Sequence, residues 1–143
     1  MATDPAHREV SAGRVTAGRF TARNGRGGQI AIGTGGDADF TPTELLLAAI
    51  GGCTAIDVDI LTSRRAEPEA FQVDVAAEKV RDAAGNHLAD IEVTFRVVFA
   101  AGEGGDAARA LLPDAVRRSH DRLCTVSRTI ELGIPVTSRV QAG

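Results

Sequence analysis

Two short stretches near the start of the chain have a pattern typical of β-strands. Residues 15–22 and 29–33 are β-compatible segments, and Asn24-Gly25 lies between them. Both of these turn residues tolerate the positive φ angles that tight hairpin turns require. The pattern therefore predicts an N-terminal β-hairpin.

A second hairpin is predicted farther along, where apolar side chains alternate with polar or small ones. The alternation covers residues 71–77 and is cleaner over residues 91–99, with a turn signal at residues 82–86 between the strands. A further segment, residues 135–140, predicts a final strand. Because hairpins and helices occupy separate stretches, the chain is predicted to form a single α+β domain over residues 1–143.

The longest helix is predicted to begin at Thr41-Pro42-Thr43-Glu44 and to end at residue 63 or 65. Thr41 can cap the helix, Pro42 suits its first turn, and Glu44 occupies the capping-box position. Residues 45–50 are apolar on every side of the helix, a pattern typical of helices surrounded by protein.

One face of this helix carries a cysteine among mainly apolar side chains, which predicts a mostly dry environment for the Cys53 thiol. Gly51-Gly52 precedes this cysteine and costs about 1 kcal/mol per glycine relative to alanine. We therefore expect a ligand, another backbone segment or a crossing helix to approach closely there. By helical spacing, the face comprises Leu46, Ala49, Ile50, Cys53, Ile56, Asp57 and Ile60.

The C-terminal third is predicted to be mainly helical. Residues 106–123 have a helical pattern, and Pro113 is expected to divide this helix or to start a second one, because proline removes an interior hydrogen bond. Residues 124–130 are expected to form a short turn or helix.

Composition narrows the classes of function. The chain has 143 residues, of which 43% are hydrophobic and 24% charged, as in ordinary soluble globular proteins. A net charge of -3 gives no electrostatic footprint for nucleic acid. The apolar run at residues 45–50 is far shorter than the roughly 20 residues that cross a bilayer. No secretory signal is evident at the N-terminus, so we expect a cytoplasmic protein without nucleic-acid or membrane partners.

The two cysteines, Cys53 and Cys124, are the main candidates for chemistry. In a reducing compartment a disulfide bond between them would be transient rather than a permanent structural cross-link. A buried cysteine is more often a small packed side chain than a nucleophile. Reactivity requires a thiolate, and hence a nearby cation or hydrogen-bond donor, whereas a charged Asp57 would oppose ionisation.

Other motifs give no prediction of a cofactor or metal. The glycine-rich residues 33–37 are not followed by the Gly-Lys-Ser/Thr of a phosphate-binding loop. His120 and Cys124 are four residues apart, but two ligands do not make a zinc site, so His120 is expected to cap or pack near the second cysteine. The Gly-x-Ser-x-Gly motif of serine hydrolases does not occur.

Two motifs resemble a known family. Residues 42–58, PTELLLAAIGGCTAIDV, closely resemble the central helix of the OsmC/Ohr family of osmotically inducible and organic hydroperoxide resistance proteins, and residues 119–127, SHDRLCTVS, are similar to its second-cysteine motif. The resemblance implies two β-hairpin-based antiparallel sheets around a long buried central helix. It also implies an intertwined homodimer with active sites built at the subunit interface.

The activity that this resemblance implies is that of a cysteine-based peroxidase. Cys53 matches the cysteine that attacks an organic hydroperoxide and becomes a sulfenic acid, and Cys124 matches the cysteine that resolves it to a disulfide. A dithiol reductant such as a lipoylated protein would then restore both thiols. No cofactor is implied.

The resemblance is less complete at the residues that activate the thiol. Organic hydroperoxide resistance proteins use an arginine from the N-terminal hairpin and a glutamate near the helix start. Thr43 occupies that glutamate position here and Glu44 is next to it, where it also suits a capping role. Arg23 is the first candidate for the activating arginine and Arg26 the second, unless both are solvated turn residues. The alternative function is a non-catalytic protein that binds a small ligand or senses redox state.

Overall fold

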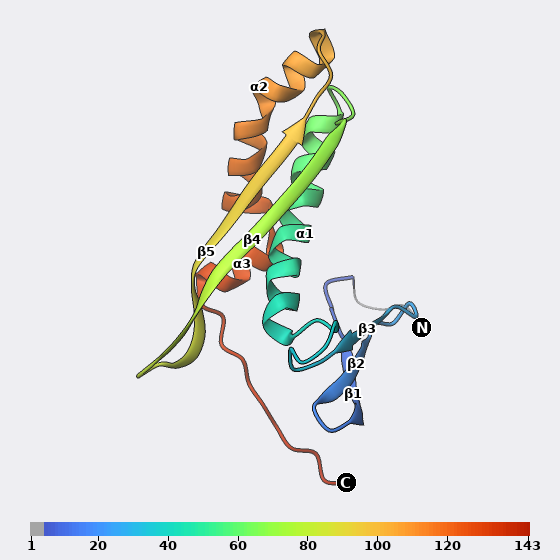
Figure 1. The fold of residues 1–143 in the computed structure, drawn as a ribbon, viewed down its shortest axis with the longest axis vertical. Coiled ribbons are helices and arrows are strands. Elements are labelled where there is room, and N and C mark those ends of the chain that lie inside the picture. Colours follow the sequence, from blue (N-terminus) through green and yellow to red (C-terminus); the bar gives the residue numbers. More distant parts are fainter. Residues whose placement is uncertain (1–4) are drawn as a thin grey trace. The chain divides into compact units, whose positions relative to one another are not determined.

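The computed structural model describes residues 5–143, which divide into two compact units. The first unit extends to Leu46 and the second comprises Leu47–Gly143, so the boundary falls inside the helix α1 (Pro42–Ser63). Figure 1 shows the elements of each unit along the chain.

The N-terminal unit contains a three-stranded antiparallel sheet in the order β1-β2-β3. Its strands are β1 (Ser11–Thr16), β2 (Arg19–Arg23) and β3 (Gln29–Ile32). The predicted turn at Asn24 is present, where the Asn24 side chain accepts backbone hydrogen bonds within the β2–β3 turn. The prediction of one unbroken strand over residues 15–22 is wrong, because Gly18, at φ 72°, forms an additional turn between β1 and β2.

The predicted start of α1 is confirmed in atomic detail. The Thr41 backbone N–H donates to Glu44 Oε1 at 2.8 Å, and the Glu44 N–H donates to Thr41 Oγ1 at 3.3 Å, which is a reciprocal capping box. The Thr41 backbone N–H also lowers the pKa of Glu44. The helix ends at Ser63, the first of the two predicted ends.

The face of α1 that the chain buries differs from the predicted one. Ile50 is buried and Cys53 and Asp57 are half-buried, but Ile56 is 61% exposed and Ile60 is 53% exposed. Apolar residues lie on more than one side of this helix, so periodicity alone did not identify the packed side. The buried residues are Ile50, Gly51, Thr54, Val58 and Thr62.

The C-terminal unit contains the second hairpin, formed by β4 (Ala70–Asp82) and β5 (Gly85–Val98). Both strands are longer than the alternation predicted. Their inner face pairs apolar side chains, and Phe71 packs edge-on against Phe95 with ring centroids 6.4 Å apart. A Cβ on Gly51 would lie only 2.9 Å from the Val75 Cγ2 atom, so the glycine allows α1 to approach β4 closely. The close neighbour of Gly51 is therefore a strand side chain rather than a second helix.

Three helical segments follow the hairpin: α2 (Glu103–Arg118), a π-helical turn η1 (Ser119–Leu123) and α3 (Thr125–Leu132). Helices α1 and α2 lie on the same side of the β4–β5 hairpin (Figure 1). The prediction that Pro113 divides or starts a helix is wrong, because α2 continues through it. Its buried residues Ala108 and Ala115 lie on either side of the proline, and their packing holds the helix together despite the lost hydrogen bond.

The predicted final strand at residues 135–140 is not formed. Val136 is 93% exposed and Val140 is 98% exposed, and the segment carries no regular structure. A β-strand needs a neighbouring strand for its backbone hydrogen bonds, and none pairs with this segment in the described part of the chain.

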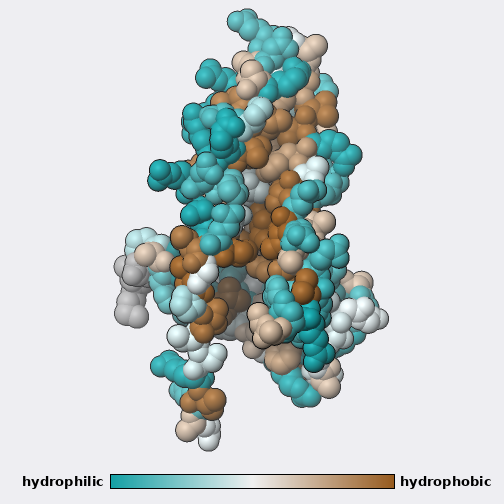
Figure 2. Space-filling model, turned by 90° about the vertical axis from the view of Figure 1, so that its left-hand side faces the viewer, coloured by the Kyte–Doolittle hydropathy of each residue, from teal (hydrophilic) through white to brown (hydrophobic). Residues whose placement is uncertain are grey.

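Apolar exposure is high across the described residues, and few large side chains are fully buried. Figure 2 shows apolar side chains gathered in a long band between hydrophilic borders in the C-terminal unit. Helix α1 as a whole, unlike its short run 45–50, is long and apolar enough to span a membrane, a criterion that core helices of soluble proteins also meet. The predicted α+β class with antiparallel sheets and helices is confirmed.

Candidate active site

Helix α1 places Cys53 at the edge of its packed face. The neighbouring residue Thr54 is buried, whereas Gly52 is exposed, and the Cys53 thiol itself is half-buried. A thiol in this position is shielded from bulk water on one side and is accessible from the other. The sequence-based expectation of a mostly dry environment therefore applies to only part of its surroundings.

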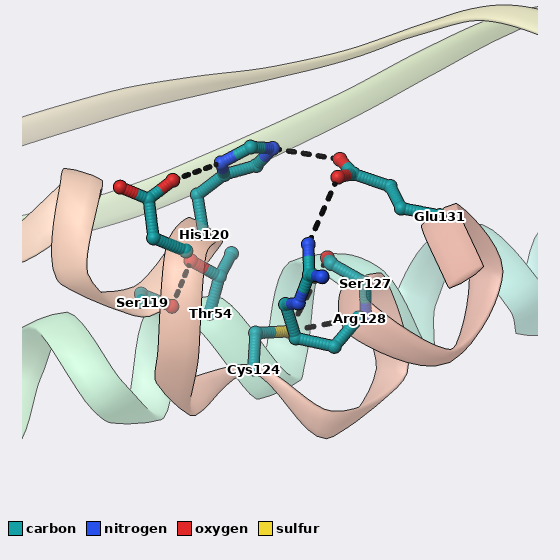
Figure 3. Close-up of polar contacts among 8 residues, drawn as sticks. Thr54, Ser119, His120, Cys124, Ser127, Arg128 and Glu131 are labelled. Atoms are coloured by element: carbon teal, nitrogen blue, oxygen red, sulfur yellow. Dashed lines mark hydrogen bonds and ion pairs between the residues drawn. The ribbon is translucent and has the colours of Figure 1, made fainter.

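The second cysteine is held at a junction between two helical segments. The π-helical turn η1 ends with the Cys124 N–H donating to the Ser119 carbonyl oxygen at 2.8 Å, and α3 begins at the next residue. Cys124 is fully buried and is the N-cap of α3, where its sulfur accepts a hydrogen bond from the Ser127 N–H at 3.4 Å. The Cys124 thiol in turn donates to Ser127 Oγ at 3.3 Å. Figure 3 shows this Cys124–Ser127 contact.

The fold brings the two cysteines together, although they are far apart in the sequence. The Sγ atoms of Cys53 and Cys124 and a carboxylate oxygen of Asp57 all lie within 4.8 Å of one another. Cys53 and Asp57 are one turn apart on α1, and Cys124 comes from the η1–α3 junction. Two thiols and a carboxylate therefore form one compact cluster, which we call the Cys53–Asp57–Cys124 cluster.

Several groups act on the ionisation of Cys53. Burial raises the pKa of the Cys53 thiol most strongly, and a hydrogen bond from the Val126 N–H partly offsets this rise. The hydrogen bond to Cys124, the electrostatic interaction with Cys124 and the negative charge of Asp57 also raise the pKa of Cys53. Each of these effects has the sign expected for burial, amide donation or like charge. The predicted opposition of Asp57 to thiolate formation agrees with this direction.

A buried chain of hydroxyl groups holds Asp57 in place. Ser119 Oγ donates to Asp57 Oδ2 at 2.9 Å and lies 2.7 Å from Thr54 Oγ1. Because a hydroxyl has only one proton to donate, the Thr54 hydroxyl is the donor to Ser119. This chain ties α1 to η1 directly beside the two cysteines.

An apolar cavity of about 420 Å³ lies next to the cluster. Thr54, one residue after Cys53, and Ser127, the hydrogen-bond partner of Cys124, both belong to its wall. Most of its apolar lining comes from Ile50 on α1, from Ile130 on α3 and from the inner face of β5. A cavity of this size and composition suits a small, largely apolar ligand.

His120 lies on the polar side of this cavity and does not cap a helix. Its Nδ1 is 2.9 Å from Asp121 Oδ1 and its Nε2 is 2.7 Å from Glu131 Oε1. Figure 3 shows the contact between His120 and Glu131. Arg128 also contacts Glu131, at 3.2 Å. The hydrogen bonds to Asp121 and Glu131 raise the pKa of His120. Because both ring nitrogens face carboxylates, the pairing of His120 with Cys124 considered from the sequence is not formed.

The remaining predicted site residues lie in the N-terminal unit. Arg23 is the last residue of β2, where its backbone pairs with Ser11 and Gln29, and Arg26 lies in the following turn. Glu44 is engaged in the capping box of α1 through both its carboxylate and its backbone amide.

Several hydrogen-bonding residues beside the cysteines had no individual role predicted from the sequence, namely Thr54, Ser119, Val126 and Ser127. The position of Ser127 could have been predicted, since it lies three residues after the N-cap residue Cys124, where a backbone N–H commonly donates to the cap side chain. The roles of Ser119 and Val126 depend on the π-helical turn, whose register no sequence pattern indicated.

Comparison with known proteins agrees with this architecture. The model of the family described as OsmC-like protein matches residues 34–139. The chain belongs to the OsmC-like protein family. The protein YhfA of Escherichia coli K12 is 32% identical over 120 residues, which cover 82% of this chain and 85% of YhfA.

Solved structures of this family share the fold at low sequence identity. An OsmC-like protein of unknown function from Vibrio cholerae superposes with a TM-score of 0.74 at 12% identity, covering 88% of this chain and 94% of that one. The organic hydroperoxide resistance protein OhrB of Bacillus subtilis superposes with a TM-score of 0.59 at 13% identity, covering 86% and 90%. The predicted relationship to OsmC/Ohr proteins is thus confirmed at the level of family and fold.

Proposed function

We propose that this OsmC-like protein is a thiol peroxidase that reduces organic hydroperoxides. The observation that carries the proposal is the approach of the Cys53 and Cys124 sulfur atoms to within 4.8 Å. Side-chain rotation alone can bring sulfurs at this separation much closer to bonding distance, whereas sulfurs on opposite sides of the unit could not meet.

The proposed cycle has three balanced steps. The Cys53 thiolate attacks one peroxide oxygen, the O–O bond breaks, and the leaving alkoxide takes a proton to become an alcohol while Cys53 becomes a sulfenic acid. The Cys124 sulfur then attacks the sulfenic sulfur, which forms the disulfide and releases water. An external dithiol, such as a lipoylated protein, reduces this disulfide and is itself oxidised to a disulfide.

Exposure favours Cys53 as the attacking residue. Its sulfur is half-buried and accepts a hydrogen bond from the Val126 N–H, whereas Cys124 is fully buried and already serves as a helix cap. The neighbouring apolar cavity supports an organic substrate over hydrogen peroxide. The structurally similar Bacillus subtilis protein is named an organic hydroperoxide resistance protein, which points to the same substrate class.

Activation of Cys53 requires a cation, since its pKa is raised and its charged neighbour Asp57 is negative. We assign this role to Arg23, with Arg26 as the second candidate, and we assign Glu44 to helix capping. The arginine would stabilise the thiolate by charge, and in a dimer it could come from either subunit.

We further propose that the protein acts as an intertwined homodimer in the cytoplasm. The exposed side of α1, with Ile56, Ile60 and the open surface at Gly52, provides an apolar face for a second copy. The unpaired segment 135–140 would then find a sheet edge on the partner. Sedimentation analysis of the parent and of Ile56→Asp protein tests this assembly, and a parent that stays monomeric at micromolar concentration would exclude it.

The decisive experiment measures peroxide consumption with cumene hydroperoxide and a dithiol reductant. The parent should turn over repeatedly and pass through an intrachain Cys53–Cys124 disulfide visible by mass spectrometry. Cys53→Ser should consume no peroxide, whereas Cys124→Ser, assayed without the dithiol, should consume one equivalent and stop at a sulfenic acid that dimedone traps. Full activity in Cys53→Ser protein would end the proposal.

A second function, redox sensing or ligand binding without turnover, is favoured by the raised pKa of Cys53. A sensor would form the disulfide once per peroxide but would not be recycled efficiently by any dithiol. A binding protein would oxidise no faster than free cysteine and would retain a small apolar ligand in native mass spectrometry. Turnover in the presence of excess reductant separates the peroxidase from both.

A further inference from the structure

The Cys53–Asp57–Cys124 cluster brings together three side chains that are metal ligands when deprotonated. Their donor atoms lie within 4.8 Å of one another, with the two sulfurs and the carboxylate converging from α1 and from the η1–α3 junction. The sequence-based expectation of no metal considered only His120 beside Cys124. It did not include Asp57. The spacing of Cys53 and Asp57 places them one turn apart on a helix, but it does not show that Cys124 lies beside both of them.

The spacing suits a small tetrahedral cation. With Zn–S bonds of about 2.3 Å and Zn–O bonds of about 2.0–2.2 Å, two ligand atoms of one Zn²⁺ lie roughly 3.6–3.8 Å apart. Donors within 4.8 Å therefore need to move inward by little more than about 1 Å, which side-chain torsions can supply. Two thiolates and one carboxylate match the borderline-soft character of Zn²⁺, whereas Mg²⁺ and Ca²⁺ prefer oxygen ligands alone.

The surroundings of the donors resemble the outer shell of a metal site. Ser119 Oγ donates to Asp57 Oδ2 and thereby fixes the orientation of the carboxylate. The backbone N–H groups of Val126 and Ser127 donate to the sulfurs of Cys53 and Cys124, respectively. Amide donors of this kind stabilise sulfur in its anionic form, which is the form that binds a metal.

We propose that the reduced chain binds one Zn²⁺ through the Cys53 and Cys124 sulfurs and an Asp57 carboxylate oxygen. Each thiol releases its proton on binding, and the fourth coordination position is open to water. His120 takes no part, since both of its nitrogens face carboxylates. The site does not depend on the proposed peroxidase activity, but it exists only while both sulfurs are free, so an intrachain disulfide and the bound metal exclude each other.

The test uses the full-length protein, freshly reduced and freed of reductant, with Zn²⁺ and with Co²⁺ as a spectroscopic probe. The parent should bind one Co²⁺ per chain with thiolate-to-metal charge-transfer absorption and tetrahedral visible bands, and Zn²⁺ should displace it. Asp57→Asn should weaken Zn²⁺ binding by at least the roughly 10- to 100-fold typical for removal of even an outer-shell partner. The matched control is Asp59→Asn, on the exposed side of the same helix, which should bind as the parent does.

A second readout uses the parent protein alone and needs no substitution. Saturating Zn²⁺ should slow alkylation of Cys53 by iodoacetamide in the parent, and pre-alkylated parent should lose the Co²⁺ charge-transfer band. Parent protein without stoichiometric metal, or equal affinity in the Asp57→Asn and Asp59→Asn proteins, would overturn the proposal. Metal binding without peroxide turnover would support the metal site and refute only the enzymatic function. Peroxide turnover without metal binding would support the enzymatic function and refute only the metal site.

Discussion

Replacing Gly51 by alanine provides a quantitative test of how closely α1 packs on the β4–β5 hairpin. A Cβ at this position would lie 2.9 Å from Val75 Cγ2, well inside the roughly 3.5–4.0 Å of a normal carbon–carbon contact. Alanine favours the helix by about 1 kcal/mol relative to glycine, but overpacking in a fitted interface costs about 1–3 kcal/mol. We therefore expect Gly51→Ala to destabilise the protein by about 1 kcal/mol.

The Val75→Ala background isolates the contact. Removing both γ-methyl groups of Val75 eliminates the overlap, so Gly51→Ala in that background should stabilise the protein by up to about 1 kcal/mol. The resulting coupling free energy of about 2 kcal/mol lies within the range found for residues in direct contact. The Gly51 and Val75 single variants, the double variant and the parent complete the cycle.

The assay is urea-induced equilibrium unfolding followed by far-UV circular dichroism at matched protein concentration, because the chain has no tryptophan or tyrosine for fluorescence. A stabilisation of about 1 kcal/mol by Gly51→Ala in both backgrounds would refute the reasoning, since it would mean that helix propensity alone governs the position. The result also concerns the site, because a shift of α1 at Gly51 would displace the Cys53 thiol two residues later.

Three further predictions concern charge and capping. Asp57→Asn removes a negative charge that raises the pKa of Cys53, so iodoacetamide should alkylate Cys53 faster than in the parent at neutral pH, and an equal or slower rate would contradict this. Thr41→Ala removes one side of the capping box and should lower the unfolding free energy by about 1 kcal/mol in urea titrations. Because the hydrogen bonds to Asp121 and Glu131 raise the folded-state pKa of His120, the stabilisation from these two interactions should be complete below the unfolded pKa of about 6.5 and be lost as pH rises through the folded value. The difference in unfolding free energy between the parent and His120→Gln should therefore shrink with rising pH, and a constant difference would contradict this assignment.

Local signals predicted the start of α1 and the β4–β5 hairpin well. The capping box depends on residues three positions apart, and the hairpin on a two-residue period, so both are decided over short distances in the chain. The turn at Gly18 was missed because a single glycine with positive φ interrupts a run that otherwise reads as one strand.

Features decided by distant neighbours were not predicted. Pro113 stays inside α2 because tertiary packing of Ala108 and Ala115 outweighs the local cost of proline. The segment 135–140 has the composition of a strand, but no strand pairs with it within residues 5–143. The sequence identified both cysteines and the opposing charge of Asp57. It did not predict the hydroxyl chain through Ser119, because this chain depends on how η1 packs against α1.

The role of the Cys124 sulfur as the cap of α3 links chemistry to helix order. This atom receives the Ser127 amide at the first turn of a helix whose Ile130 lines the cavity. A sulfur in a disulfide has no S–H proton to donate to Ser127 Oγ, so oxidation would remove one of the two hydrogen bonds between Cys124 and Ser127 and loosen the first turn of α3. Amide exchange at Ser127 would then report the oxidation state of the protein, and the cavity wall at Ile130 would be less ordered in the oxidised form than in the reduced form.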